Sequence, residues 1–244
     1  MVSVVNGDEH PTRTTAAPMA AAMDSPSQTP GRWSKIAPLF AVLFVAFVVA
    51  SIFTLNPPAS DASPLSILHF YRTHKNQTSI SAVLIPPAVV FGLIWFSYLR
   101  SWLQRRDVDH RWGTLTLAGG ILFAVTGGVA GGALAALGDS PDHLTLSSAQ
   151  TLNYLQNDMP AILASMAFGV MAIAAGVAML KSARLPTWLG WVSLILGILG
   201  VVPVGDFFAL PAIGVWTLLV AGVVYFRSDP DGTLVVAMQD GSTP

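Results

Sequence analysis

The sequence predicts an all-α protein: a polytopic six-helix transmembrane bundle with short extracytoplasmic interfacial helices. Hydrophobic residues make up 53% of the chain and charged residues 10%, whereas soluble domains carry about 25% charged residues. Long runs without a charge recur along the chain. At about 1.5 Å per residue, the run 114–138 is long enough to cross a hydrocarbon core of about 30 Å. Shorter polar or charged segments separate the runs.

Composition also excludes several classes of function. The formal net charge is −1, so no basic excess indicates a nucleic-acid partner. The chain has no cysteine, which excludes disulfides, thiolate metal sites and thiol catalysis. Its only glutamate is Glu9, close to the N-terminus. Any carboxylate chemistry in the membrane domain must therefore use aspartates.

The chain divides into a membrane domain and two tails. Residues 1–31 are rich in Ala, Pro, Ser and Thr without apolar periodicity, which predicts a disordered N-terminal tail rather than a signal peptide. Residues 228–244 predict a second disordered tail. In the domain between them, 32–227, we expect membrane spans at about 36–55, 79–98, 114–138, 159–180, 187–204 and 207–226.

Two polar segments predict helices that lie in the membrane interface. Ser63 followed by Pro64 is typical of a helix start, with serine as the cap and proline at the first helical position. We expect this helix to end near His74. The segment Thr145–Gln156 predicts a second interfacial helix before the fourth span.

The basic residues predict the orientation. With six spans, both termini lie on one side, and ten of the 12 Lys and Arg residues lie on that side. They are Arg13, Arg32, Lys35, Arg100, Arg105, Arg106, Arg111, Lys181, Arg184 and Arg227. Only Arg72 and Lys75 lie opposite. The positive-inside rule then places both termini in the cytoplasm of a multi-pass protein of the cell membrane. The charged loop 99–112 anchors this topology and is suited to contact anionic lipid headgroups.

The run 114–138 carries its glycines in pairs. Gly127 and Gly131 form one small-xxx-small pattern, and Gly128 with Gly132 forms another. Small residues let helices approach closely in lipid. We therefore expect this run to be the central helix of the bundle, with more than one face able to accept a partner.

The spans offer little for catalysis. No ionisable residue lies near the middle of a predicted span, where ion-coupled transporters and voltage sensors usually place one. The deep hydroxyls are Thr126, Ser165 and Ser193, and we expect them to bond to helix backbone rather than act as nucleophiles. The sequence thus favours a protein that is not an enzyme and has no cofactor.

Polar residues gather instead on the predicted outer side. The candidate outer site consists of Asp206, Asp158, His69, His143, Asp139 and Asp142. One interpretation is that Asp158 and Asp206 cap the fourth and sixth spans and the others are solvated loop residues. The other interpretation is that they line a polar vestibule or bind a divalent metal, for which Asp139, Asp142 and His143 are the densest group.

One junction resembles a known family. The segment 181–191, KSARLPTWLGW, is similar to an LP-x-WLGW junction of six-span integral membrane proteins of actinobacteria. The segment 65–75, LSILHFYRTHK, also resembles that family, and the likeness covers about residues 36–226. Thr187 stands where the family often has a basic residue. The resemblance implies the six-span architecture and no activity, so it assigns no catalytic residue.

Three functions follow as hypotheses. The first is a non-enzymatic bundle that binds lipid, acts as a scaffold, or partners another membrane protein or itself. The second is a transporter or channel for a small solute, with an outer vestibule near Asp206 and Asp158. The third is a metal-dependent enzyme or sensor at the outer face.

Overall fold

The computed structural model describes the backbone of residues 33–105, 109–182, 185–201 and 206–227, and their side chains except at 33–34 and 206–210. Both predicted tails, Arg106, Arg184 and the Asp206 side chain therefore lie outside the described residues. In the described ranges every regular element is helical, as expected. The elements are α1 (Trp33–Thr54), α2 (Pro64–Thr73), α3 (Lys75–Gln104), α4 (His110–Asp139), η1 (Pro141–His143), α5 (Leu146–Lys181), α6 (Thr187–Val201) and α7 (Asp206–Arg227).

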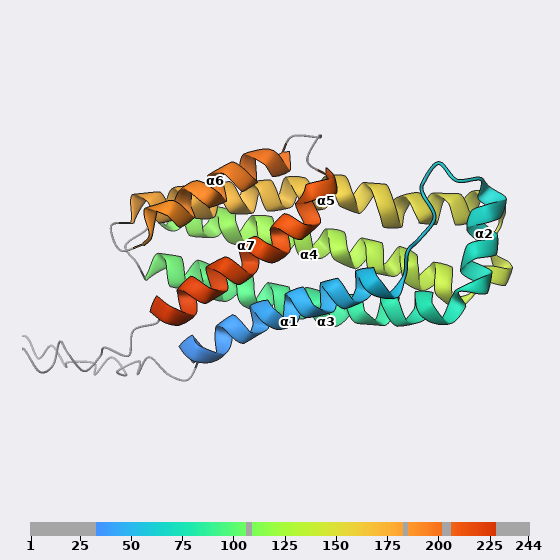
Figure 1. Ribbon diagram of the computed structural model, residues 1–244, viewed down its shortest axis with the longest axis horizontal. Helices are drawn as coiled ribbons and strands as arrows, with labels where there is room; N and C mark the ends of the chain where they lie inside the picture. Colours follow the sequence, from blue (N-terminus) through green and yellow to red (C-terminus); the bar gives the residue numbers. More distant parts are fainter. Residues whose placement is uncertain (1–32, 106–108, 183–184, 202–205, 228–244) are drawn as a thin grey trace, which may run out of the picture. The chain divides into compact units, whose positions relative to one another are not determined.

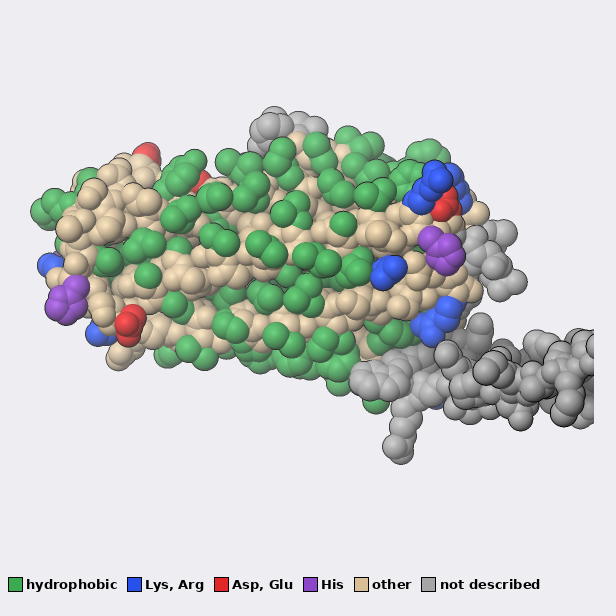
Figure 2. All heavy atoms as spheres, turned by 180° about the vertical axis from the view of Figure 1, so that it is seen from behind, with side chains coloured by type: hydrophobic (Ala, Val, Ile, Leu, Met, Phe, Trp, Pro, Cys, Tyr) green, Lys and Arg blue, Asp and Glu red, His purple; other side chains and the backbone are tan. Residues whose placement is uncertain are grey.

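Four of these helices are long and apolar enough to cross a membrane. They comprise Lys35–Thr54 of α1 and the whole of α3, α4 and α5. The helix α6 and the part of α7 whose side chains are described, Pro211–Arg227, are shorter apolar helices. On the face seen in Figure 2, hydrophobic side chains cover the middle of the bundle, and charged side chains gather toward its two ends. This distribution is what a bilayer requires.

The helices pack in chain order, with α1 against α3, α3 against α4, α4 against α5 and α5 against α6, while α7 contacts α1, α5 and α6 (Figure 1). The central helix is α5 and not α4, contrary to our expectation. Within the most apolar window of each helix, 61% of residues are buried in α5 and 39% in α4. The reason is that α4 packs mainly against α3 and α5, whereas α5 packs against α4, α6, α2 and α7.

Glycines bring α5 and α6 to backbone contact. A Cβ added at Gly176 would lie 2.9 Å from the carbonyl oxygen of Gly190, and one at Gly197 would lie 3.0 Å from that of Gly169. Gly169 and Gly176 of α5 lie seven residues apart, as do Gly190 and Gly197 of α6. The same face of each helix therefore contacts the other helix at two levels. Gly190 and Gly197 thus form a small face of α6 that packs against α5.

The helix α2 begins as predicted. Ser63 is its N-cap and accepts a hydrogen bond from the backbone N–H of Ser66 at 3.2 Å, with Pro64 as the first helical residue. The helix lies across the end of the bundle where α1 ends and α3 begins (Figure 1). Only His74 separates it from α3, so the polar residues from Lys75 onward belong to the third helix.

The predicted break before the fourth span is wrong. The second interfacial helix and the fourth span are one continuous helix, α5, whose cap is Thr145; its side chain accepts from the N–H of Ser148 at 3.2 Å. Asp158 lies inside α5 and is not a cap, and Pro160 is accommodated within the helix. The loop 99–112 is also shorter than predicted, because α3 runs to Gln104 and α4 begins at His110.

Two hydrophobic clusters build the described core. The larger cluster joins α1 and α3–α7 and contains Trp95, Phe96, Phe168 and Trp216. The smaller one lies at the α2 end and contains Leu55, Ile67, Tyr71, Leu134 and Leu137. The region between the two clusters is not fully packed, and this gap is the candidate site.

Candidate functional site: an apolar cavity between four helices

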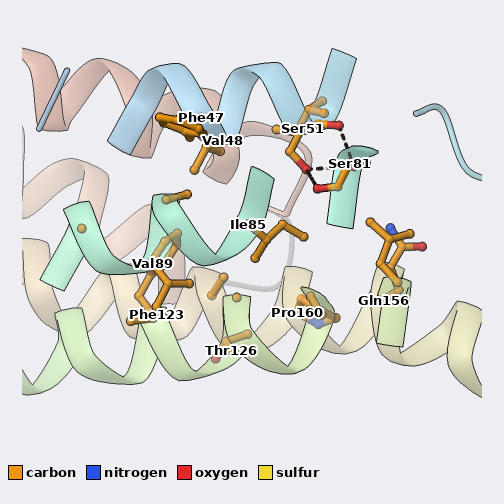
Figure 3. A pocket seen from close by; sticks show the side chains of 18 of the residues that line it. Phe47, Val48, Ser51, Ser81, Ile85, Val89, Phe123, Thr126, Gln156 and Pro160 are labelled. Atoms are coloured by element: carbon orange, nitrogen blue, oxygen red, sulfur yellow. Dashed lines mark hydrogen bonds between the residues drawn. The ribbon is translucent and has the colours of Figure 1, made fainter. Parts of the chain in front are cut away.

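A cavity of about 330 Å³ lies between α1, α3, α4 and α5 (Figure 3). This volume is at the lower end of the range of ligand pockets, about 300–1,000 Å³. Small side chains on three of the helices leave the space open. They are Ala88 and Gly92 of α3, Ala124, Gly127 and Ala130 of α4, and Ala161 and Ala164 of α5.

One end of the cavity is aromatic. The rings of Phe44 and Phe96 meet edge to face with centroids 5.8 Å apart, and Phe44 meets Phe123 in the same way at 5.9 Å. Gly92 makes room for this cluster, since a Cβ there would lie 3.1 Å from Phe44. All three rings are buried. Edge-to-face aromatic pairs form a rigid apolar wall.

The hydroxyls in the middle of the cavity are already hydrogen-bonded. Ser51 of α1 and Ser81 of α3 have their Oγ atoms 2.9 Å apart, and each also donates to the other's carbonyl oxygen, at 3.2 and 3.0 Å. Thr126 donates to the carbonyl oxygen of Leu122 at 2.8 Å. The two serines link α1 to α3, and Thr126 bonds within α4. All three hydroxyls are therefore used within the protein and offer a ligand little.

The opposite end of the cavity is formed by two amide side chains of α5, Gln156 and Asn157. Asn157 Nδ2 donates to the carbonyl oxygen of Pro58 at 3.0 Å and to Asn153 Oδ1 at 3.2 Å. The hydroxyl of Tyr71 donates to Asn153 Oδ1 at 2.8 Å and to Gln156 Oε1 at 3.1 Å. The connection between α1 and α2, together with α2 itself, is thereby tied to α5 at this end of the cavity.

Burial raises the pKa of the Tyr71 phenol above its ordinary value, because the charged phenolate would lose its solvation. Tyr71 therefore remains a neutral hydrogen-bond donor at physiological pH. Asn153 is fully buried as well. The hydrogen bond between the buried Tyr71 hydroxyl and the buried Asn153 amide therefore fixes the position of α2 on α5.

Three aspartates of the predicted outer site have partners of their own. Asp142 forms an ion pair with Arg72 at 3.2 Å, and Asp158 accepts a hydrogen bond from Ser60. Asp139 accepts from Ser140 at 3.4 Å, and His69 and His143 are exposed. Among the described residues no three His, Asp or Glu side chains are placed to hold a metal ion. The role of the Asp206 side chain stays a prediction.

The deep hydroxyls behave as expected. Thr126, Ser165 and Ser193 each donate to the carbonyl oxygen four residues earlier in the chain, at 2.8, 2.6 and 2.8 Å. Ser193 also accepts from Trp216 Nε1 at 2.8 Å, which joins α6 to α7. Their hydrogen-bonding capacity is used within the bundle.

The two glycine faces of α4 differ. A Cβ at Gly131 would lie 2.8 Å from Ile85 of α3, and one at Gly127 would lie 3.6 Å from Val89. Added Cβ atoms at Gly128 and Gly132 would meet no described atom within 4 Å. One small-xxx-small face therefore packs inside the chain, and the other has no described neighbour.

No family model matches the chain, and neither a curated protein nor a solved structure matches it. The resemblance to six-span actinobacterial proteins consequently stays an expectation. The cavity itself was not among the sites expected from the sequence. The only local signal for it is the series of small residues on three helices, and a small residue marks close packing as often as it marks open space.

Proposed function

We propose that this chain is a multi-pass membrane protein that binds an apolar molecule, taken from the lipid phase, in the cavity between α1, α3, α4 and α5. The observation that carries the proposal is the lining. It is aromatic and aliphatic over most of its surface, and none of the described residues that form it has an ionisable side chain. A polar solute would leave water and find free hydrogen-bonding groups only at the Gln156 and Asn157 end, whereas an apolar solute loses nothing.

The proposal includes six spans with both termini in the cytoplasm. The helices α6 and α7 supply the fifth and sixth apolar segments, and they pack on α5 and α1. The start of α1 and the end of α7 lie at the same end of the bundle (Figure 1). With six spans, ten of the 12 Lys and Arg residues fall on the side of the termini by sequence, and this excess supports a cytoplasmic position for the termini.

A scaffold or partner-binding role is the alternative, and it would use the uncovered Gly128 and Gly132 face of α4. Oligomeric state in lipid nanodiscs separates the two functions. A monomer that retains a ligand supports the cavity, whereas a dimer or larger assembly without ligand supports the alternative.

The test is photolabelling of the purified protein in nanodiscs with a hexadecane that carries a diazirine. Labels on Phe44, Phe96 and Phe123 are diagnostic, because these side chains are buried and bulk lipid does not reach them. Ala130→Phe fills the cavity from α4 and should abolish these labels. Ala136→Phe makes the same change at an exposed position of the same helix and should leave them unchanged.

If the ring labels are absent in the wild type, or persist at full yield in a folded Ala130→Phe variant, the cavity does not bind hydrocarbon. Ala161→Phe, which enters the cavity from α5, gives the same information if Ala130→Phe does not fold.

A further inference from the structure

We infer that the ligand of this cavity is a neutral, single-chain amphiphile with a hydroxyl headgroup, whose hydroxyl lies at Gln156 and Asn157 and whose chain extends toward the rings of Phe44, Phe96 and Phe123. The inference rests on the proposed function and adds the class and the orientation of the ligand.

The two ends of the cavity differ in the way the two ends of an amphiphile differ. The three phenylalanines close one end without a polar group, and the amides of Gln156 and Asn157 form the other. Figure 3 shows Gln156 beside Pro160, well away from Phe123. Between the two ends the hydroxyls of Ser51, Ser81 and Thr126 are used within the bundle. A molecule that fills the cavity therefore finds free polarity at one end only.

The two amides leave hydrogen-bonding capacity that the protein does not use. Asn157 Nδ2 has two acceptors, Pro58 O and Asn153 Oδ1, while its Oδ1 has no partner among the described residues. Gln156 Oε1 accepts from Tyr71, and its Nε2 also has no described partner. One acceptor and one donor on adjacent residues match a hydroxyl, which both donates and accepts.

A hydroxyl also fits if the Gln156 amide turns over. Tyr71 has a single hydroxyl hydrogen, and Asn153 Oδ1, at 2.8 Å, is the closer of its two acceptors. Gln156 Nε2 could then donate to the Tyr71 oxygen and present Oε1 to the ligand, which would donate to it. An ester or ketone, which can only accept, fits the orientation of Gln156 that presents Nε2 and not the one that presents Oε1.

The headgroup should be neutral because the cavity has no counter-charge. The lining residues carry no ionisable side chain in the described ranges, and Asp158 next to Asn157 accepts from Ser60. Arg72 and Lys75 line a separate surface hollow at the α2–α3 junction. A buried sulfate or phosphate without a cation nearby would lose its hydration uncompensated. The volume of about 330 Å³ favours one chain over two.

The experiment compares three probes of equal chain length in nanodiscs: hexadecane, 1-hexadecanol and hexadecyl sulfate. Retained probe per protein is measured by mass spectrometry after purification. We expect the wild type to retain 1-hexadecanol about 3- to 10-fold better than hexadecane, as one or two hydrogen bonds would give, and to retain hexadecyl sulfate least.

Gln156→Leu should lower retention of the alcohol toward that of hexadecane and leave hexadecane unchanged. The matched control is Gln150→Leu, at an exposed position of the same helix, which should change nothing. Gln156→Met is the second variant, with a more flexible side chain. If neither Gln156 variant folds, the ranking of the three probes on the wild type still decides the headgroup.

The outcomes separate the two proposals. Equal retention of hexadecane and 1-hexadecanol by the wild type, or a folded Gln156→Leu that still prefers the alcohol, would overturn the assignment of the hydroxyl and leave the proposed function standing. Preferred retention of hexadecyl sulfate would overturn the neutral headgroup. If no probe is retained above the level of the cavity-filling Ala130→Phe, the proposed function itself is wrong.

Discussion

Adding one methyl group should have opposite effects at a glycine of α4 that faces α5 and at a glycine of α4 that has no described neighbour. At Gly119 a Cβ would lie 2.8 Å from the backbone nitrogen of Met171 and 2.9 Å from the carbonyl oxygen of Ala167. These are backbone atoms of α5, so relief requires the two helices to separate. At Gly128 a Cβ would meet nothing described within 4 Å. The pair Gly119→Ala and Gly128→Ala therefore applies the same chemical change to a packed site and an open site.

The magnitude follows from two opposing effects. Alanine favours the helix by about 1 kcal/mol over glycine at either position, and overpacking a well-packed site costs about 1–3 kcal/mol. Because the helix-propensity gain is common to both variants, their difference isolates the overpacking cost. We expect Gly119→Ala to be about 1–3 kcal/mol less stable than Gly128→Ala, and Gly128→Ala to equal or exceed the wild type.

Equilibrium unfolding in mixed micelles of dodecyl sulfate and a mild detergent measures both free energies of unfolding under identical conditions. Equal stability of the two variants would refute the close approach of α4 to α5. A larger loss in Gly128→Ala would show that α4 presents its other face to the bundle.

Three further results are expected. Ser193→Ala should lower the free energy of unfolding by about 1–3 kcal/mol, measured in the same micelles, because it leaves the buried Trp216 Nε1–H without its acceptor. The raised pKa of Tyr71 means that the folded protein holds the phenol proton more tightly than the unfolded chain does. The resulting contribution of Tyr71 to the free energy of unfolding is complete below about pH 10, the ordinary tyrosine pKa, and declines above it. Unfolding followed from pH 8 to 11 should thus show a shallower alkaline loss for Tyr71→Phe than for the wild type. Asp142→Ala should change stability by no more than about 0.5 kcal/mol at any salt concentration, since the Arg72–Asp142 pair is 45% and 74% exposed.

Local rules predicted those parts of the fold that local forces determine. The α2 start depends on two adjacent residues, Ser63 and Pro64, and it is where the sequence places it. The deep hydroxyls Thr126, Ser165 and Ser193 bond to their own helices, because a hydroxyl in an apolar helix has a carbonyl oxygen within reach one turn earlier.

Tertiary contacts decided what local rules could not. The sequence predicts a helix start at Asp158, shortly before Pro160. Instead, the side chains of Asn153 and Asn157 donate to the carbonyl oxygen of Pro58 and thereby hold the preceding turns of α5 in place. The helix accepts Pro160, because the contacts of a long packed helix outweigh one missing hydrogen bond. In the same way, the glycine pattern of α4 predicted two packing faces, and only the position of α3 determines which one is used.

The candidate site was the least predictable part. The sequence predicts a site from ionisable aspartates and histidines, yet Asp142 and Asp158 have their own partners. The cavity depends on empty space between four helices that are distant in sequence. No sequence pattern within one segment predicts such a space. The polar character of its Gln156 and Asn157 end depends on which of their amide groups the folded protein leaves without a partner among the described residues.

The most direct test of ligand binding is a crystal structure grown from bilayers that contain 1-hexadecanol with a bromine at the end of its chain. We expect an anomalous bromine peak inside the cavity, against the rings of Phe44, Phe96 and Phe123, with the hydroxyl beside Gln156 and Asn157. A cavity without bromine, or one filled with ordered water from Gln156 to Phe123, would contradict the account.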